Sequence, residues 1–192
     1  MQLLRLDGPY QEAVTEDEAK LYLRIEHHLD DNILRTMIAA ARTMVEQYTG
    51  QTLIEQKWRM TIGANDRSFN KGGTLQVGIP MSPFQKLDGR PKVIKPNKIL
   101  EIANYKLSRD AGFGTVEVIT CLGSKDELQL EFTVGYGPTA ESVPASFKQA
   151  ILMLLAEMYE NRSGGSNSKA VPVIINGSVK NLLDAHRVRR LL

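Results

Sequence analysis

Hydrophobic residues recur at the spacing of an α-helix in two long segments of the chain. The first covers residues 31–49 and is followed by Gly50, which suits the left-handed position that closes many helices. The second covers residues 144–161, where Pro144 stands in the first turn and its missing amide hydrogen costs nothing. Apolar residues three and four positions apart form one stripe on each helix, so the two helices are expected to pack together. The side chains expected in this helical core are Ile33, Leu34, Met37, Ile38, Ala41, Val45, Tyr48, Phe147, Ile151, Leu154, Leu155 and Met158.

Two shorter helices are expected nearer the ends of the sequence. Thr15 and Glu18 stand at the spacing of a capping box, in which each side chain binds the other residue's backbone amide. This pattern predicts a helix over residues 15–27. A final helix is expected over residues 178–190, where Leu182 and His186 are one helical turn apart.

Between the two long helices the period of the hydrophobic residues changes from that of a helix to that of a strand. Residues 128–134 alternate Leu, Leu, Phe and Val with Gln, Glu and Thr, and shorter segments around Trp58, Leu75 and Val116 alternate in the same way. Such alternation predicts strands with one buried and one wet face, as in an antiparallel sheet. Stretches rich in Gly and Pro separate the strands. We therefore expect a meander of short strands over residues 53–137.

These elements make one α+β domain with four parts. A helical core of residues 14–50 and 143–162 encloses the β-rich insert of residues 53–137. The stretch SGGSNSK lies in a linker of residues 163–175, which is flexible by composition. The linker separates the core from a basic C-terminal tail of residues 176–192, which is expected to dock on a partner.

Composition excludes several classes of protein. The 24 Lys and Arg residues nearly balance the 22 Asp and Glu residues, and the net charge of +2 lacks the strong positive field of a dedicated nucleic-acid-binding protein. Cys121 is the only cysteine, so an intramolecular disulfide and a cysteine-based zinc cage are excluded. The longest apolar run, residues 150–156, is too short to span a bilayer, and the first residues lack the pattern of a signal peptide. We expect synthesis in the cytoplasm and no membrane partner.

No arrangement of residues predicts catalysis. His27 and His28 are neighbours on the predicted helix and point in different directions, so they are expected at an exposed helix end rather than on a metal ion. The glycines of residues 112–114 and 135–137 lack the lysine of a phosphate-binding loop and are expected in turns. We therefore expect no enzyme activity, no cofactor and no metal site.

Five segments in a fixed order carry a resemblance to a known family. They are TEDEAKLYLRI at 15–25, IAAARTMVEQYTG at 38–50, VGYG at 134–137, VPASFKQAILMLLAEMYENR at 143–162 and LLDAHRVRRL at 182–191. The E-x-Y-T-G ending of the second segment and the V-P-x-x-x-K-Q-A-I opening of the fourth are the most specific. Together the segments resemble the head-to-tail connector, or adaptor, proteins of long-tailed bacteriophages and related gene-transfer particles.

The resemblance implies a structural protein of the virion head–tail interface. Such a protein forms a ring, expected to be dodecameric, that docks under the portal after DNA packaging and extends the DNA channel. Its partners would be the portal protein, a stopper or tail-completion protein, and further copies of itself, with DNA only as passing cargo. In that family the C-terminal segment commonly helps to grip the portal. The residues then expected to dock on the portal are Leu182, Leu183, His186, Arg187, Arg189, Arg190 and Leu191.

Two other hypotheses stay open at this point. A DNA-binding packaging or regulatory protein would use Arg187, Arg189 and Arg190, and its affinity would fall steeply with salt because phosphate binding releases counterions. Balanced charge and few aromatic residues argue against it. An enzyme whose site matches no familiar pattern is the third hypothesis.

Overall fold

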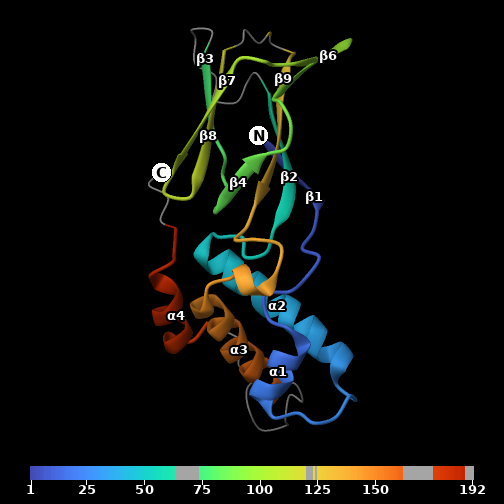
Figure 1. Ribbon diagram of the computed structural model, residues 1–192, viewed down its shortest axis with the longest axis vertical. Helices are drawn as coiled ribbons and strands as arrows, with labels where there is room; N and C mark the ends of the chain where they lie inside the picture. Colours follow the sequence, from blue (N-terminus) through green and yellow to red (C-terminus); the bar gives the residue numbers. More distant parts are fainter. Residues whose placement is uncertain (64–73, 120–122, 124, 162–174, 189–192) are drawn as a thin grey trace. The chain divides into compact units, whose positions relative to one another are not determined.

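The structure, a computed structural model, divides the chain into two compact units of different type. It describes residues 1–63, 74–119, 123, 125–161 and 175–188 (Figure 1). One unit, here the β unit, consists of Met1–Pro9 and Glu55–Tyr136, and the other, here the helical unit, consists of Tyr10–Ile54 and Gly137–Leu192. The α+β class is confirmed, although the β unit also takes in the first residues of the chain, which the predicted insert did not include.

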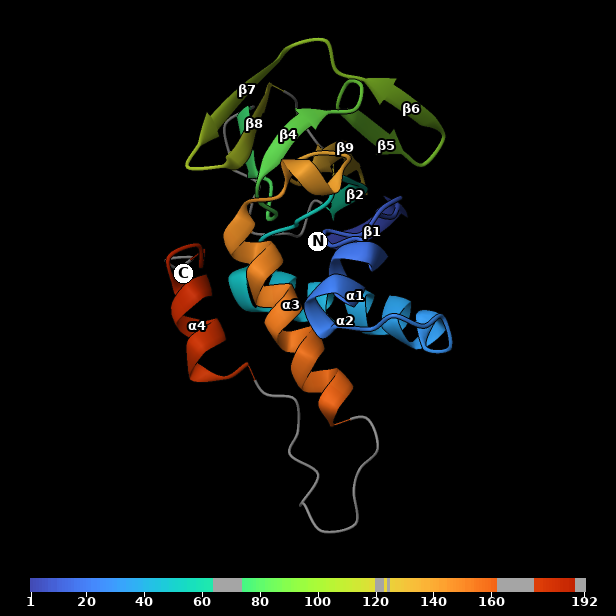
Figure 2. The same cartoon turned by 60° about the horizontal axis from the view of Figure 1, so that its bottom comes forward.

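The helical unit is built on two long helices and two short ones. They are α1 (Glu16–Leu23), α2 (Asp31–Thr49), α3 (Ala145–Glu160) and α4 (Gly177–Asp184). The helix α2 packs against α3, and α3 lies between α1 and α4 (Figure 2). The apolar residues buried in this unit include Leu34, Ile38, Ala41, Val45, Phe147, Ile151, Leu154, Leu155, Val179 and Leu183.

The structure corrects part of the predicted helical core. Met37, Tyr48 and Met158 are only half-buried, and Ile33 is 46% exposed because its neighbour Leu34 takes the inward position on α2. The helix itself covers the predicted residues, and Gly50 closes it with a φ of 71°. Which apolar residues of α2 are buried depends on the angle at which α3 packs against α2. The period of the sequence does not predict this angle.

Three predicted helix ends are wrong. The helix α1 ends at Leu23 rather than at residue 27, because Arg24 adopts a left-handed φ of 59° and Ile25 bonds back to the carbonyl of Lys20. The helix α4 ends at Asp184, and residues 185–188 are not helical. Pro144 precedes α3 as its cap instead of standing in its first turn.

The β unit contains two antiparallel sheets. The first has the order β1-β2-β9-β5-β6, with β4 also paired to β9. Its strands are β1 (Gln2–Asp7), β2 (Gln56–Gly63), β4 (Phe84–Leu87), β5 (Lys92–Lys95), β6 (Lys98–Glu101) and β9 (Glu127–Val134). The second sheet has the order β3-β8-β7, with β3 (Thr74–Gly78), β7 (Tyr105–Asp110) and β8 (Phe113–Ile119). Both sheets contribute to one hydrophobic core, which includes Met60, Ile62, Leu75, Val77, Val116, Val118, Leu128, Leu130 and Phe132.

The predicted meander is wrong, although the antiparallel pairing is right. The strand β9 is last in the sequence but pairs with β2, β4 and β5 in the middle of the large sheet. Gly112 lies in a two-residue turn between β7 and β8, where it and Ala111 both have positive φ. Of the three residues predicted to form a turn at 112–114, Gly112 lies in the turn, whereas Phe113 and Gly114 belong to β8.

Candidate assembly surfaces

The helix α4 packs into the helical unit. The side chain of Asn176 caps α4 by accepting a hydrogen bond from the amide of Val179 at 3.0 Å. Val179 and Leu183 lie about one helical turn apart, and both are fully buried. Leu183 was expected to dock on a portal, but its side chain fills the core of its own chain. Of the predicted linker, residues 163–174 lie outside the described part.

The described residues after α4, 185–188, also contact the rest of the helical unit. The ring of His186 lies against that of Phe147, with 4.7 Å between the ring centroids, and its Nε2 is 2.8 Å from the Oγ of Ser146. The amide of Val188 donates to the carbonyl of Thr49 at 2.9 Å, at the end of α2. His186 is therefore half-buried and held in place, not presented freely to a partner.

Among the predicted docking residues that the structure describes, Arg187 is the exposed one. Its guanidinium lies over the ring of Tyr48 at 5.1 Å, and the Tyr48 hydroxyl donates to Asp184 at 2.6 Å. The hydrogen bond to Asp184 raises the pKa of Tyr48. Leu182 is half-buried. The other predicted docking residues, Arg189, Arg190 and Leu191, lie outside the described part of the chain.

A buried ion pair joins the segment before α1 to α2. Arg42, with its side chain only 9% exposed, donates to Glu12 and to Glu46, each at 2.7 Å. Glu46 also accepts from the amide of Leu53 at 2.8 Å, so the same group holds the chain on its way to β2. Burial raises the pKa of Glu46 in spite of Arg42. Burial opposes the charge on Arg42, but its bonds to the two glutamates outweigh burial and raise its pKa.

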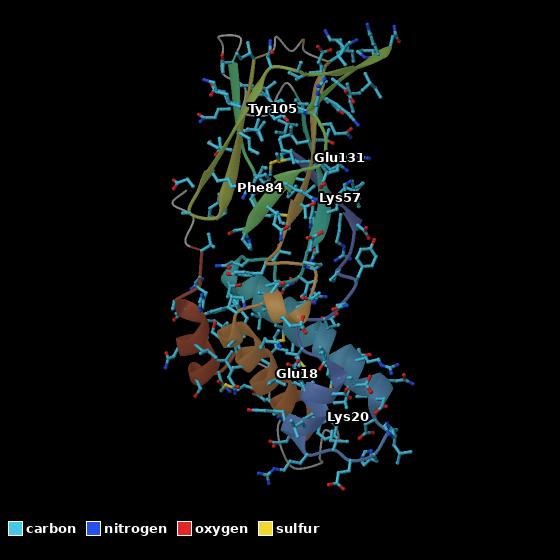
Figure 3. All side chains as sticks on the ribbon, viewed as in Figure 1. Glu18, Lys20, Lys57, Phe84, Tyr105 and Glu131 are labelled. Atoms are coloured by element: carbon cyan, nitrogen blue, oxygen red, sulfur yellow. The ribbon has the colours of Figure 1, made fainter. Side chains whose placement is uncertain are left out.

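The helix α1 is fixed at its first turn by the predicted capping box. The Thr15 hydroxyl accepts from the amide of Glu18 at 3.2 Å, and Glu18 accepts from the amide of Thr15 at 2.9 Å. Glu18 also pairs with Lys148 on α3 at 2.7 Å. Burial opposes the charge on Glu18, but these bonds lower its pKa. Figure 3 labels Glu18 together with Lys20, one of the residues that join α1 to α2.

Lys20 connects the two helices through carboxylates on both. Its ammonium lies 3.2 Å from Glu16 on α1 and 2.6 Å from Asp31 at the start of α2. His28 is 3.1 Å from Asp31 as well. The hydrogen bond from Lys20, with a further one from His28, lowers the pKa of Asp31 to about 2. These ion pairs explain how the connection between α1 and α2 is held.

The Asp31 contacts should make stability depend on acid pH. The pKa of Asp31 is about 2 in the folded protein and about 3.9 in an unfolded chain. The Asp31 contacts therefore make their full contribution to the free energy of unfolding above the pKa of the unfolded chain. It is lost as the pH falls from about 4 to about 2. We expect Asp31→Asn to be less stable than the original chain at pH 6, with the difference narrowing toward pH 2. Urea unfolding at several pH values measures this, and a difference independent of pH would contradict it.

Candidate metal ligands do not gather in the described part of the chain. No group of three or more His, Cys, Asp or Glu side chains in that part is placed to hold a metal ion. His27 and His28 were predicted at an exposed helix end. They are exposed, but they lie in the connection between α1 and α2 and not on a helix. None of the described helices has the length and apolar character needed to cross a membrane. Cys121 lies outside the described residues.

Part of the sequence is similar to a family of connectors of phage heads and tails. The model of the family described as phage gp6-like head-tail connector protein matches residues 15–78, which run from the cap of α1 to the end of β3. The match confirms the resemblance noted from the sequence. None of the curated proteins matches the chain.

Solved structures with the same fold come from gene transfer agent (GTA) particles. A chain in the neck of the empty particle, computed with C6 symmetry, gives a TM-score of 0.77 at 20% identity, covering 100% of this chain and 98% of that one. A chain in the neck of the native particle, computed with C12 symmetry, gives 0.73 with the same identity and coverage. A third chain, from the virion of the native particle, gives 0.72. The likeness extends over both units.

Proposed function

We propose that this chain is a head–tail connector subunit that assembles as a ring in the neck of a virion or gene-transfer particle. The observation that carries the proposal is the fold, which matches neck chains over 98% of their length. The family match is independent support, because it rests on sequence and not on coordinates. The necks concerned were computed with C6 and C12 symmetry, which agrees with a ring of identical subunits.

We further propose that the ring docks under the portal, extends the DNA channel and provides the platform for a stopper or tail protein. Arg187 is the described residue best suited to contact the portal, because it is exposed and oriented by Tyr48. Leu183 and His186 serve a different purpose from the one expected of them. They hold the segment against α2 and α3, so that Arg187 is presented from a fixed position.

Imaging a mixture of this chain with its cognate portal ring tests the proposal. A ring of copies of this chain against the portal is the expected result. Absence of a complex over a wide range of salt concentrations would contradict it. Duplex DNA should be tested in parallel, because portal-independent DNA binding that falls steeply with salt would favour the packaging or regulatory alternative.

Arg187→Ala should weaken binding to the portal by about tenfold, which corresponds to a charged contact worth about 1.4 kcal/mol. Lys180→Ala is the matched control, because it removes a positive charge from an exposed position on α4. Portal binding can be measured by co-sedimentation. Equal affinities for the two variants would show that Arg187 makes no contact with the portal.

A further inference from the structure

The side chain of Arg187 is exposed, but it is held at a fixed place on the helical unit. The backbone on both sides of it is bound to the end of α2. The Gln51 side chain donates to the carbonyl of His186, and the amide of Val188 donates to the last carbonyl of the helix at 2.9 Å. The guanidinium itself lies over the ring of Tyr48. An arginine that is held in this way loses little conformational entropy when it binds a partner.

Arg187 has no carboxylate partner among the residues that the structure describes. Asp184, at the end of α4, is the acidic residue nearest to it in the sequence, but its carboxylate accepts the hydrogen bond of the Tyr48 hydroxyl at 2.6 Å. No ion pair joins Arg187 to Asp184 or to another described acidic residue. Tyr48 thus orients the guanidinium with its ring, while its hydroxyl binds the carboxylate that would otherwise be available to it.

The contact with the Tyr48 ring leaves the guanidinium of Arg187 able to bind an anion. An aromatic ring attracts the positive charge but accepts no strong hydrogen bond from the N–H groups. These groups form a rigid planar fork, which matches the two oxygens of a carboxylate or of a phosphate. A lysine at the same position would carry the charge without the fork. The geometry therefore fits an oxyanion that is bound through two parallel hydrogen bonds.

We propose that Arg187, oriented by Tyr48, binds one carboxylate side chain of the portal. This inference rests on the proposed function, which places Arg187 against the portal, and it adds the chemical group that is bound. The surroundings favour a carboxylate over the phosphates of DNA. Asp and Glu outnumber Lys and Arg among the described residues of the helical unit, whereas DNA binding needs a positive field over many phosphates. A single fork-shaped contact needs one acidic group.

Replacing Arg187 with lysine tests the fork. Arg187→Lys should weaken portal binding by about tenfold, nearly as much as Arg187→Ala, because lysine keeps the charge but cannot form two parallel hydrogen bonds. Co-sedimentation with portal rings measures both affinities. A lysine variant that binds as tightly as the original chain would show that the charge alone matters, and the fork would be wrong.

Tyr48→Phe tests the part that the tyrosine hydroxyl takes. The variant keeps the ring under Arg187 but leaves Asp184 without its hydrogen-bond donor, so that this carboxylate can compete for the guanidinium. Portal binding should fall by about threefold, a loss in the range of an exposed ion pair. The double variant Tyr48→Phe/Asp184→Asn removes the competing charge and should recover the affinity. No recovery would mean that Tyr48 has only a structural role.

Carbodiimide coupling identifies the group that Arg187 binds. The reagent joins a lysine amine to a nearby carboxylate as an amide and takes up the water that is lost, whereas it does not couple an arginine in this way. In the saturated portal complex, Arg187→Lys should give a new cross-link from residue 187 to an Asp or Glu of the portal, which mass spectrometry can locate. Asn181→Lys, at an exposed position on α4, is the matched control and should give no such cross-link.

The outcomes separate the carboxylate site from the connector function. If the original chain binds the portal but residue 187 gives no cross-link, or gives one only to a second copy of this chain, the carboxylate site on the portal is wrong and the connector function stands. If Arg187→Ala lowers the affinity for duplex DNA and not for the portal, the bound group is a phosphate and the inference is also wrong. If the original chain does not bind the portal, both proposals fall.

Discussion

Replacing Arg42 with methionine should destabilise the helical unit by about 3–5 kcal/mol, the range for removing one partner of a buried ion pair. Arg42 is the cation between Glu12 and Glu46, and its side chain is 9% exposed. Methionine fills much of the same volume, so the main loss is the charge. The substitution leaves Glu46 buried without its cation, although the amide of Leu53 still donates to it.

The Arg42→Met variant should also depend on pH in a distinctive direction. Burial already raises the pKa of Glu46 above that of an exposed glutamate, and loss of Arg42 raises it further. A carboxyl whose folded pKa is raised favours folding at low pH, and this contribution is lost as the pH rises through the folded pKa. The variant should therefore regain part of its stability as the pH falls from 7 to 5.

Arg35→Met is the matched control for this experiment. Arg35 also pairs with a glutamate, Glu16, at 2.7 Å, but its side chain is 63% exposed. Exposed pairs of this kind contribute about 0–1 kcal/mol, so Arg35→Met should change the free energy of unfolding little. Urea unfolding at several pH values gives the free energy of unfolding of both variants, so that the two losses can be compared. Equal losses for the two would show that burial of Arg42 has no energetic role.

The long helix α2 could be predicted from sequence because its local signals agree. Its period, its start near Asp31 and its end at Gly50 all favour the same residues. The ion pair at Arg42 could not be found in the same way. Arg42 and Glu46 are four residues apart, which on most helices means an exposed pair on the solvent face. Two segments outside α2 contact this pair, one through Glu12 and the other through the amide of Leu53, and the spacing on the helix predicts neither contact.

The strand β1 and the partners of β9 could not be predicted from the sequence either, because both depend on distant parts of the chain. Residues 2–7 contain no β-branched residue and only a short apolar run, so local propensity does not indicate a strand. The strand forms because β2 offers it an edge. The alternation in 128–134 predicts a strand but not its partners, and a strand central to a sheet can be paired by segments far away in the chain.

Shortening the chain by residues 176–192 should unfold or strongly destabilise the helical unit, although the sequence predicted a tail that a flexible linker separates from the core. Two fully buried side chains, Val179 and Leu183, would be lost, and each contributes about 1.5–3 kcal/mol. The hydrogen bonds of Tyr48 to Asp184 and of Gln51 to the carbonyl of His186 would be lost with them. A total of several kcal/mol is a large share of the stability of an ordinary domain, about 5–15 kcal/mol.

Leu183→Ala gives the finer test, because it keeps the backbone and removes only the buried side chain. We expect a loss of about 2–5 kcal/mol, the range for leucine in a core. Leu182→Ala, one residue earlier and half-buried, is the matched control and should cost less. The chain has a single tryptophan, Trp58 on β2, so its fluorescence follows the β unit while circular dichroism at helical wavelengths follows mainly the helical unit. A loss in the helical transition that exceeds the loss in the Trp58 transition would place α4 within the helical core in solution, whereas an unchanged helical transition would mean that α4 is detached and free to dock.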